Sequence, residues 1–232
     1  MSINKDAYNS IKTKTDAANA LLVAVSKTKP NADILALYDL GHRDFGENYV
    51  QELLKKQVEL PSDIRWHFIG HLQTNKVKQI APFVHLIHGV DSFRMLDAIE
   101  KEGKKLNKKI NCLIQVHIAE EETKFGFDFT EAREAATHFF IEKKYPHINL
   151  CGLMGMASFT ENVTLIKEEF TVLKSLFDEI KSLKDKEDDE DSVSFNTLSM
   201  GMSADYSIAL EKGSTLVRIG SLLFGARGLR PV

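Results

Sequence analysis

Cysteine, a strong net charge and long apolar runs are scarce or absent in this sequence, and each absence argues against a class of protein. Two cysteines in 232 residues are too few for a disulfide-stapled fold. The 30 basic and 33 acidic side chains nearly cancel, so no basic surface is expected to attract a nucleic-acid backbone. No apolar run approaches the roughly 18 residues of a membrane-spanning helix, and the start MSINKDAYNSIKTKTDAANA has no apolar signal segment. The sequence therefore predicts a cytoplasmic protein with neither nucleic-acid nor membrane partners.

Eight short apolar runs alternate with longer segments of helical period. With 43% hydrophobic residues the chain can bury a large core. Almost no tight hairpin separates the runs, which favours a parallel sheet with crossover helices. Eight such units at this length predict one (β/α)8 TIM-type barrel, a single α/β domain over residues 1–232, after an N-terminal helix that ends near Ala20. An open doubly wound sheet becomes the better interpretation if the second or the fourth run is not a strand. The expected strands are 21–25, 43–45, 65–69, 83–87, 111–118, 148–154, 193–198 and 215–219.

Polar and small residues follow the first three and the last two of these strands. In a barrel such residues meet at one rim, where the reactive groups lie. Lys27, in AVSKTKP, follows a continuous apolar strand, so burial and neighbouring cations favour its neutral amine, which can form a Schiff base. Lys29 precedes Pro30, which favours an extended backbone that leaves the barrel. Lys27 is thus the better candidate, and the alternative is that both lysines form surface ion pairs.

The last two loops predict an anion-binding site. The stretch LSMGMSAD is predicted to open a helix with Ala204 and Asp205 in its first turn, and the start of a helix presents free N–H groups and partial positive charge. Gly220 and Ser221 add N–H groups after the last strand, between loops seven and eight, where barrels often bind phosphate. The structural alternative is N-capping by Ser203 together with a glycine required for packing.

Arg218 is the third element of the predicted site. It lies in the apolar strand TLVRI, where a buried charge has to be paired or has to serve a ligand. Its side chain faces the side opposite to Val217 and Ile219. A structural salt bridge would satisfy it. An arginine beside a phosphate site and facing a Schiff-base lysine is, however, what pyridoxal phosphate requires, because its ring nitrogen commonly contacts Asp or Arg.

Five strings carry a resemblance to a known family: AVSKTKP, FGENYVQE, WHFIGHLQTNK, LSMGMSAD and VRIGSLLFGAR. From about Leu21 to Arg227 the chain resembles the YggS/PROSC family of pyridoxal phosphate homeostasis proteins. The resemblance implies a barrel similar to the N-terminal domain of alanine racemase, of PLP fold type III but without a second β-domain. It also implies pyridoxal 5′-phosphate (PLP) held as an internal aldimine. Position by position, it implies Lys27 as the aldimine lysine, Arg218 at the pyridine nitrogen, Met202, Ser203, Gly220 and Ser221 around the phosphate, and Asn48, His71 and Asn75 at the mouth.

The expected chemistry of such a site is restricted. An arginine at the ring nitrogen disfavours its protonation, so the ring is a poorer electron sink, and racemisation needs a second base on the opposite face. Alanine racemase takes that base from an additional C-terminal domain, which this chain is expected to lack, since it ends soon after Gly220 and no tyrosine follows Tyr206. We therefore predict a monomeric carrier, buffer or regulator of PLP rather than an enzyme, with apo-PLP enzymes as candidate partners. A PLP-dependent racemase and an aldolase with Lys27 as its Schiff-base residue are the alternatives.

The remaining polar residues are mostly predicted to be structural. His67 and His71 lie on either side of a strand end, which disfavours a shared zinc site, and no metal is predicted. His88, next to the expected fourth strand, is predicted to be hydrogen-bonded in the core or at the rim. The loop EEETKFGF, with Lys124, either closes over the ligand or is structural. The acidic run at 184–192, which has no counterpart in the family pattern, is predicted to be a solvated loop.

Overall fold

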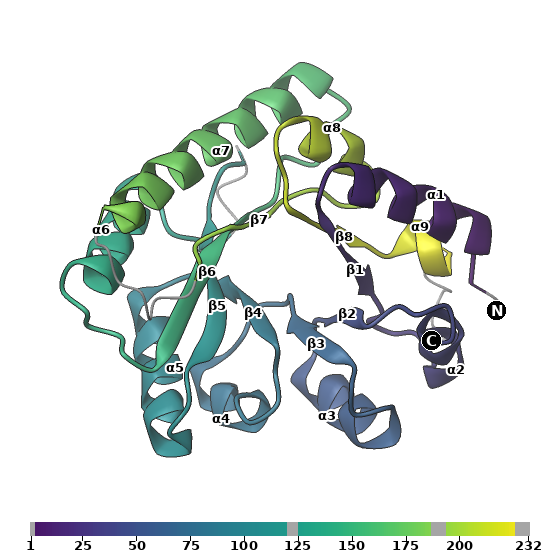
Figure 1. Cartoon of the computed structure of the whole chain (residues 1–232), viewed down its shortest axis with the longest axis horizontal. Coiled ribbons are helices and arrows are strands. Elements are labelled where there is room, and N and C mark those ends of the chain that lie inside the picture. Colours follow the sequence, from purple (N-terminus) through teal and green to yellow (C-terminus); the bar gives the residue numbers. More distant parts are fainter. Residues whose placement is uncertain (1–2, 120–124, 187–193, 226–232) are drawn as a thin grey trace.

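Eight parallel strands form a closed barrel in the computed structural model, which describes residues 3–119, 125–186 and 194–225. The strands pair in chain order, and β1 closes the ring by pairing with β8. Figure 1 looks approximately along the barrel and shows the strands as an inner ring with helices outside it. The predicted (β/α)8 barrel is therefore confirmed, and the doubly wound alternative is wrong. The strands are β1 (Leu21–Val25), β2 (Asp44–Glu47), β3 (Arg65–Phe68), β4 (Leu86–Val90), β5 (Ile110–Val116), β6 (Ile148–Gly155), β7 (Thr197–Ser199) and β8 (Leu216–Ile219).

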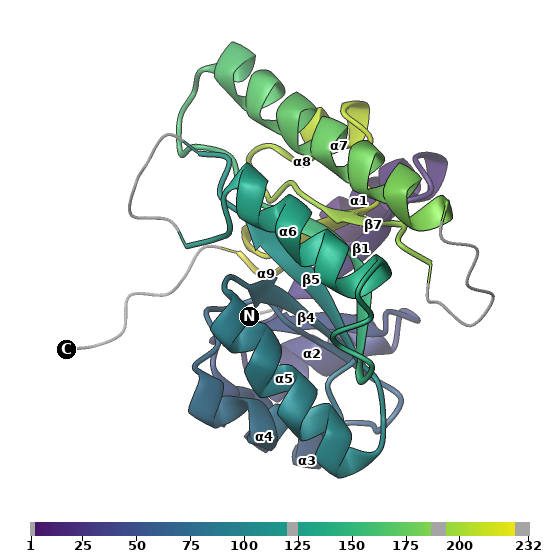
Figure 2. The same cartoon turned by 90° about the vertical axis from the view of Figure 1, so that its left-hand side faces the viewer.

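The helices cover the outside of this ring. The expected N-terminal helix is present as α1, which contacts β1 and α9 and occupies the outer ring between α8 and α2 (Figure 1). Figure 2 shows α7, α6 and α5 following one another across the outer surface. No helix in the described ranges is long and apolar enough to cross a membrane. The helices are α1 (Lys5–Ala17), α2 (Asn31–Tyr38), α3 (Val50–Glu59), η1 (Thr74–Lys76), α4 (Val77–Ile80), α5 (Phe93–Leu106), α6 (Phe129–Phe140), α7 (Val163–Asp185), α8 (Tyr206–Glu211) and α9 (Ser221–Phe224).

The helix ends follow local chemistry. Ser92 caps α5 by accepting a hydrogen bond from the Met95 N–H, and Asn107 ends the same helix in the left-handed conformation. Asp128 and Glu131 form a reciprocal capping box at the start of α6. These caps fix where each helix begins and therefore how the preceding loop leaves its strand.

Two apolar regions hold the barrel together. The larger lies between the strands and the helices and includes Val217 and Ile219 of β8. The smaller lies inside the barrel and consists of Val23, Leu86, Leu113, Met154 and Leu216, with Cys151 and Met156 packed against it. Because side chains alternate along a strand, Arg218 shares the inner face with Leu216. The predicted orientation of Arg218, opposite to Val217 and Ile219, is confirmed.

Three predicted boundaries are wrong by three residues or more. The seventh strand, predicted over 193–198, spans Thr197–Ser199. The fourth strand spans Leu86–Val90 rather than 83–87: Phe83 and Val84 close the turn after α4, and His85 is exposed. The seventh loop does not continue as a helix from Ser203, because α8 begins at Tyr206. The Met202 N–H is instead held by the Asp205 side chain at 2.6 Å, which keeps this stretch a tight loop.

Candidate functional site

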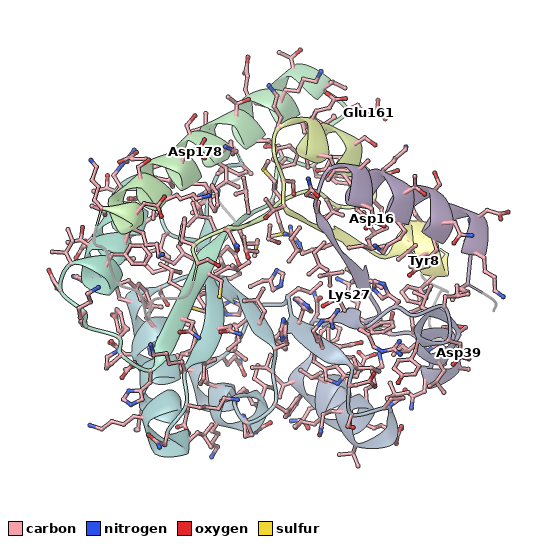
Figure 3. All side chains as sticks on the ribbon, in the orientation of Figure 1. Tyr8, Asp16, Lys27, Asp39, Glu161 and Asp178 are labelled. Carbon is pink, nitrogen blue, oxygen red and sulfur yellow. The ribbon has the colours of Figure 1, made fainter. Side chains whose placement is uncertain are left out.

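Lys27 lies at the carboxyl end of β1, where its chain turns sharply out of the barrel. The side chain is half-buried, and Figure 3 shows it near the inner edge of the ring, whereas Tyr8 and Asp16 lie on α1 outside. The next residue, Thr28, has φ 62°, a left-handed conformation that β-branched residues rarely adopt. Its N–H donates to Glu52 Oε1 at 2.7 Å. The turn that presents Lys27 is thus strained and is held from outside by a carboxylate.

Lys29, the competing lysine, has a different environment. Its Nζ donates to the carbonyl oxygens of Phe224 at 2.9 Å and Gly225 at 3.2 Å, at the end of α9. This ammonium caps free carbonyl groups of a helix end. Lys29 therefore ties the first loop to the last helix.

A buried ion cluster lies directly beneath the Lys27 turn. Glu47, at the end of β2 and fully buried, accepts hydrogen bonds at Oε1 from Ser26 Oγ at 2.6 Å and from Lys56 Nζ at 2.7 Å. Lys56 Nζ also donates to the Ser26 carbonyl at 2.8 Å and to Glu52 Oε1 at 2.6 Å. Burial raises the pKa of Glu47, and the Lys56 ammonium opposes that rise. The residues on both sides of Lys27, Ser26 and Thr28, are therefore anchored to one charge cluster.

Asn48 follows Glu47 at the mouth. Its Oδ1 is buried and has no hydrogen-bond partner among the described residues, which is costly unless a ligand or water supplies one. The backbone of Asn48 packs against Gly70 so closely that a Cβ on Gly70 would lie 2.4 Å from the Asn48 carbonyl oxygen. The loops after β2 and β3 are thus pressed together, with an unsatisfied amide oxygen between them and the mouth.

His71 and Asn75, both predicted to line the mouth, are exposed. His71 Nδ1 lies 3.0 Å from Asp91 Oδ2, and its ring stacks on Phe125 at a centroid distance of 4.4 Å. These contacts tie the loops after β3, β4 and β5 together at the rim. Asn75 lies in η1, and no contact in the described part of the chain links it to Lys27. The structure therefore places His71 and Asn75 at the rim rather than deep in the site.

The seventh and eighth loops meet as predicted. The Gly220 N–H donates to Ser203 Oγ at 3.3 Å, although this bond is long. Gly220 also lies against β1, since a Cβ there would be 3.3 Å from both the Cβ and the carbonyl oxygen of Val25. Met202 and Ser221 flank this junction and are exposed. Gly220 thus brings both loops against Val25, which lies two residues before Lys27 in the chain.

Arg218 lies inside the barrel beside β1 and is almost completely buried. Its strand pairs in register with β1, with Arg218 opposite Val23. Nη1 donates to Ser199 Oγ at 2.5 Å and to the Ser199 carbonyl at 2.9 Å, and Nη2 donates to the Gly155 carbonyl at 3.2 Å. Burial lowers the pKa of the Arg218 guanidinium to about 10, and the Asp205 charge opposes that shift. No carboxylate in the described ranges forms an ion pair with it.

The structure thus gathers Lys27, Asn48, Ser203, Arg218 and Gly220 at the carboxyl end of the barrel. Sequence reasoning missed Glu47, Lys56 and Ser199, which hold these residues in place. One signal was available for Glu47, because it lies in the string FGENYVQE, directly after the expected second strand. Among the predicted loop features, Lys124 lies outside the described residues, as does most of the acidic run at 184–192.

A separate polar group occupies the opposite end of the barrel. Asp44, His67 and His85 place ligand atoms within 4.8 Å of one another. Arg65, however, donates to both Asp44 oxygens, from Nε at 2.7 Å and from Nη2 at 2.5 Å, so these oxygens are already satisfied by a cation. His71 lies at the mouth, at the other end of the barrel from this group.

Comparison with known proteins gives consistent matches over nearly the whole chain. Residues 5–228 match the family of the alanine racemase N-terminal domain. The chain is 41% identical over 209 residues to the pyridoxal phosphate homeostasis protein of Aquifex aeolicus, covering 90% of this chain and 87% of that protein. It is 38% identical over 217 residues to the protein of the same name from Homo sapiens, covering 89% and 76%. The structure of PipY from Synechococcus elongatus with PLP bound matches with a TM-score of 0.81 at 28% identity, covering 95% of this chain and 99% of PipY.

Proposed function

Since this chain belongs to the family of pyridoxal phosphate homeostasis proteins, within that of the alanine racemase N-terminal domain, we propose that it binds PLP and serves in PLP homeostasis. PLP is bound in the PipY structure that this fold resembles. The observation that carries the proposal is the pairing of β1 with β8. That pairing places the amine of Lys27, the buried guanidinium of Arg218 and the junction of the seventh and eighth loops at the same end of two adjacent strands.

The residues present fit this cofactor. The buried Asn48 Oδ1 lacks a partner in the described part of the chain and is available to a donor group on a ligand. At the start of α9, the N–H groups of Ser221 and Leu222 have no acceptor among the described residues, so they can bind a phosphate oxygen. Among the described residues, three of the five N–H groups of Arg218 have acceptors, and the other two can donate to an unprotonated ring nitrogen.

Each predicted residue has a role in this proposal. When bound, PLP supplies an aldehyde that condenses with a primary amine and releases water. Lys27 provides the amine and holds the cofactor as a Schiff base, and Arg218 orients the ring through its nitrogen. The phosphate is held by Met202, Ser203, Gly220 and Ser221, and the mouth is lined by Asn48, His71 and Asn75.

The same geometry supports a role in carrying PLP rather than in catalysis. A guanidinium at the ring nitrogen disfavours protonation there, which weakens the ring as an electron sink. A racemase also needs a base on the second face of the ring. The hydroxyl of Tyr206 accepts a hydrogen bond from Lys14 Nζ of α1 at 3.3 Å, so it serves the outer layer and not the mouth. The proposal therefore describes a carrier or buffer without catalytic turnover, and racemisation of an amino-acid panel by the purified protein would contradict it.

The proposal also covers the oligomeric state, the location and the partners of the protein. We expect residues 1–232 to act as a single PLP-binding domain, as a monomer in the cytoplasm, that passes the cofactor to apo-PLP enzymes. Sedimentation equilibrium tests the monomer. Reactivation of an apo-enzyme by the loaded protein, compared with free PLP at the same concentration, tests transfer.

The central experiment compares Lys27→Ala with Lys29→Ala. The wild-type protein and Lys29→Ala are expected to show the absorption band of a Schiff base with PLP, and borohydride reduction should fix the label on the peptide that contains residue 27. Lys27→Ala should lose the band and the label while keeping weaker, noncovalent binding through the phosphate contacts. A label on any other lysine of the wild-type protein refutes the assignment, and absence of PLP binding to the wild type refutes the function.

A further inference from the structure

A line of buried polar side chains runs through the barrel interior, away from the mouth. Arg218 Nη1 donates to Ser199 Oγ at 2.5 Å, and Ser199 Oγ lies 3.2 Å from His88 Nδ1. His88 Nε2 lies 3.0 Å from His67 Nδ1, and His67 Nε2 lies 3.1 Å from Asp44 Oδ1. All five residues are buried. Together they form the axial line, which links β8, β7, β4, β3 and β2.

The chemistry of its two ends sets the direction of every hydrogen bond in the axial line. Arg218 has only donors, and an ionised Asp44 has only acceptors. Burial raises the pKa of Asp44, but hydrogen bonds from His67 and Arg65 outweigh this effect and hold that pKa well below its usual value. Burial also lowers the pKa of His88 well below its usual value, so that imidazole is neutral.

One arrangement gives every donor of the axial line an acceptor: His67 donates from Nε2 to Asp44 and accepts at Nδ1 from His88 Nε2. His88 Nδ1 then accepts from the Ser199 hydroxyl, which leaves a lone pair of Ser199 Oγ for Arg218. In the reversed arrangement His88 donates from Nδ1 to Ser199 Oγ, which then accepts from both His88 and Arg218 and no longer donates its own proton to His88.

The orientation of the guanidinium therefore depends on the direction of the axial line. Both N–H groups of Arg218 Nη1 bind Ser199, one through its carbonyl and one through its hydroxyl. A third N–H binds the Gly155 carbonyl. These three bonds fix the plane of the guanidinium, and the remaining two N–H groups take whatever direction that plane gives them.

The far end of the line is open to solvent. Arg65, whose side chain is 47% exposed, donates to both oxygens of Asp44. Arg65 and Asp44 border a cavity of about 370 Å³ at the amino ends of β1 to β3, next to α1. The direction of the axial line is thus set at the face of the barrel opposite to Lys27.

We propose that Ser199, His88, His67 and Asp44 are positioning residues, which act through Arg218 to aim its guanidinium at the ring nitrogen of PLP. The inference rests on the proposed function, because that nitrogen is present only when PLP binds. A network with a merely structural role would change folding stability, but it would not distinguish between ligands that differ at one ring atom.

Asp44→Asn tests the proposal through the direction of the line. Arg65 has only donors, so it claims the amide oxygen of the variant and leaves the amide NH2 facing His67. His67 then has to accept at Nε2, and both histidines are expected to change from the Nε2–H to the Nδ1–H tautomer. Long-range ¹H–¹⁵N NMR at neutral pH reads the tautomers directly. A wild-type protein with either imidazole charged, or with Nδ1–H tautomers, overturns the proposal.

Binding to two ligands provides the second measurement. The first is PLP, and the second is its deaza analogue, in which C–H replaces the ring nitrogen but the aldehyde and phosphate remain. Asp44→Asn is expected to weaken PLP binding about 3- to 10-fold, the range for one lost hydrogen bond, and to leave the affinity for the analogue unchanged. Arg43→Gln is the matched control, since it breaks the neighbouring Arg43–Asp63 pair, which is not part of the line.

Ser199→Ala is a second variant that tests the proposal if Asp44→Asn fails to fold. It removes only the hydroxyl that Arg218 and His88 share, and it should weaken binding of PLP but not of the analogue. Equal weakening of both ligands by either variant, or no weakening at all, overturns the proposal. Failure of the proposed function is recognised separately, because the wild-type protein would then bind neither ligand.

Discussion

Replacing Lys56 by methionine tests the buried cluster that anchors the Lys27 turn. The Lys56 side chain is 5% exposed, and its ammonium contacts Glu47 Oε1 at 2.7 Å and the Ser26 carbonyl at 2.8 Å. Methionine keeps most of the apolar stem but leaves the fully buried Glu47 carboxylate without its cation. Loss of one partner from a buried ion pair costs about 3–5 kcal/mol. We expect the free energy of unfolding of Lys56→Met to fall by about that amount at pH 8.

The loss should depend on pH in a defined direction. Burial already raises the pKa of Glu47, and removal of the ammonium raises it further. A carboxyl group whose folded pKa exceeds its unfolded value adds stability only while it is protonated, so the variant should regain stability as pH falls from about 8 to about 5. Urea unfolding followed by circular dichroism measures this, with Lys55→Met, an exposed neighbour, as control. A loss below about 1 kcal/mol at pH 8, or no recovery at pH 5, would refute the reasoning.

Three further substitutions probe other parts of the fold. Gly70→Ala should lower the free energy of unfolding by about 1–3 kcal/mol and weaken PLP binding, because the new Cβ would lie 2.4 Å from the Asn48 carbonyl oxygen. Thermal unfolding with and without PLP measures both effects, and unchanged values would contradict the close contact. Burial lowers the pKa of His42 to about 4, so the stability that it adds is complete above about pH 6.5 and is lost as pH falls toward 4; His42→Gln should flatten the unfolding profile in that window, and an unchanged slope would count against it. Leu113→Ala, inside the barrel, should cost about 2–5 kcal/mol in urea unfolding, and a smaller loss would mean that the interior collapses around the gap.

The strands that could be predicted from the sequence are those with apolar side chains on both faces, as parallel strands require. The first strand was predicted with its observed ends, Leu21–Val25. The fourth was displaced by three residues because His88 and Gly89 resemble a strand end. Inside the barrel His88 is paired with Ser199 and His67, and partners on distant strands leave no trace in the local pattern.

The candidate site was predicted in part for the same reason. Lys27, Arg218 and Gly220 are recognisable because each breaks or ends an apolar strand, and the structure brings them together. Glu47 and Lys56 lie nine residues apart on a strand and a helix, and nothing local indicates that they form a buried pair. The assignment of individual residues to the ring and the phosphate stays a prediction until the adducts are mapped.

The pairing of β1 with β8 has a consequence for the order of events during synthesis. In the proposed site the lysine comes from the first strand of the barrel and the guanidinium from the last. We therefore expect that both strands have to be made before the site can bind PLP, and that early fragments do not bind it. A ligand that binds only the folded state stabilises that state more as its concentration rises. Abundant PLP would therefore favour the closed barrel, and a low PLP concentration would leave newly made chains easier to unfold.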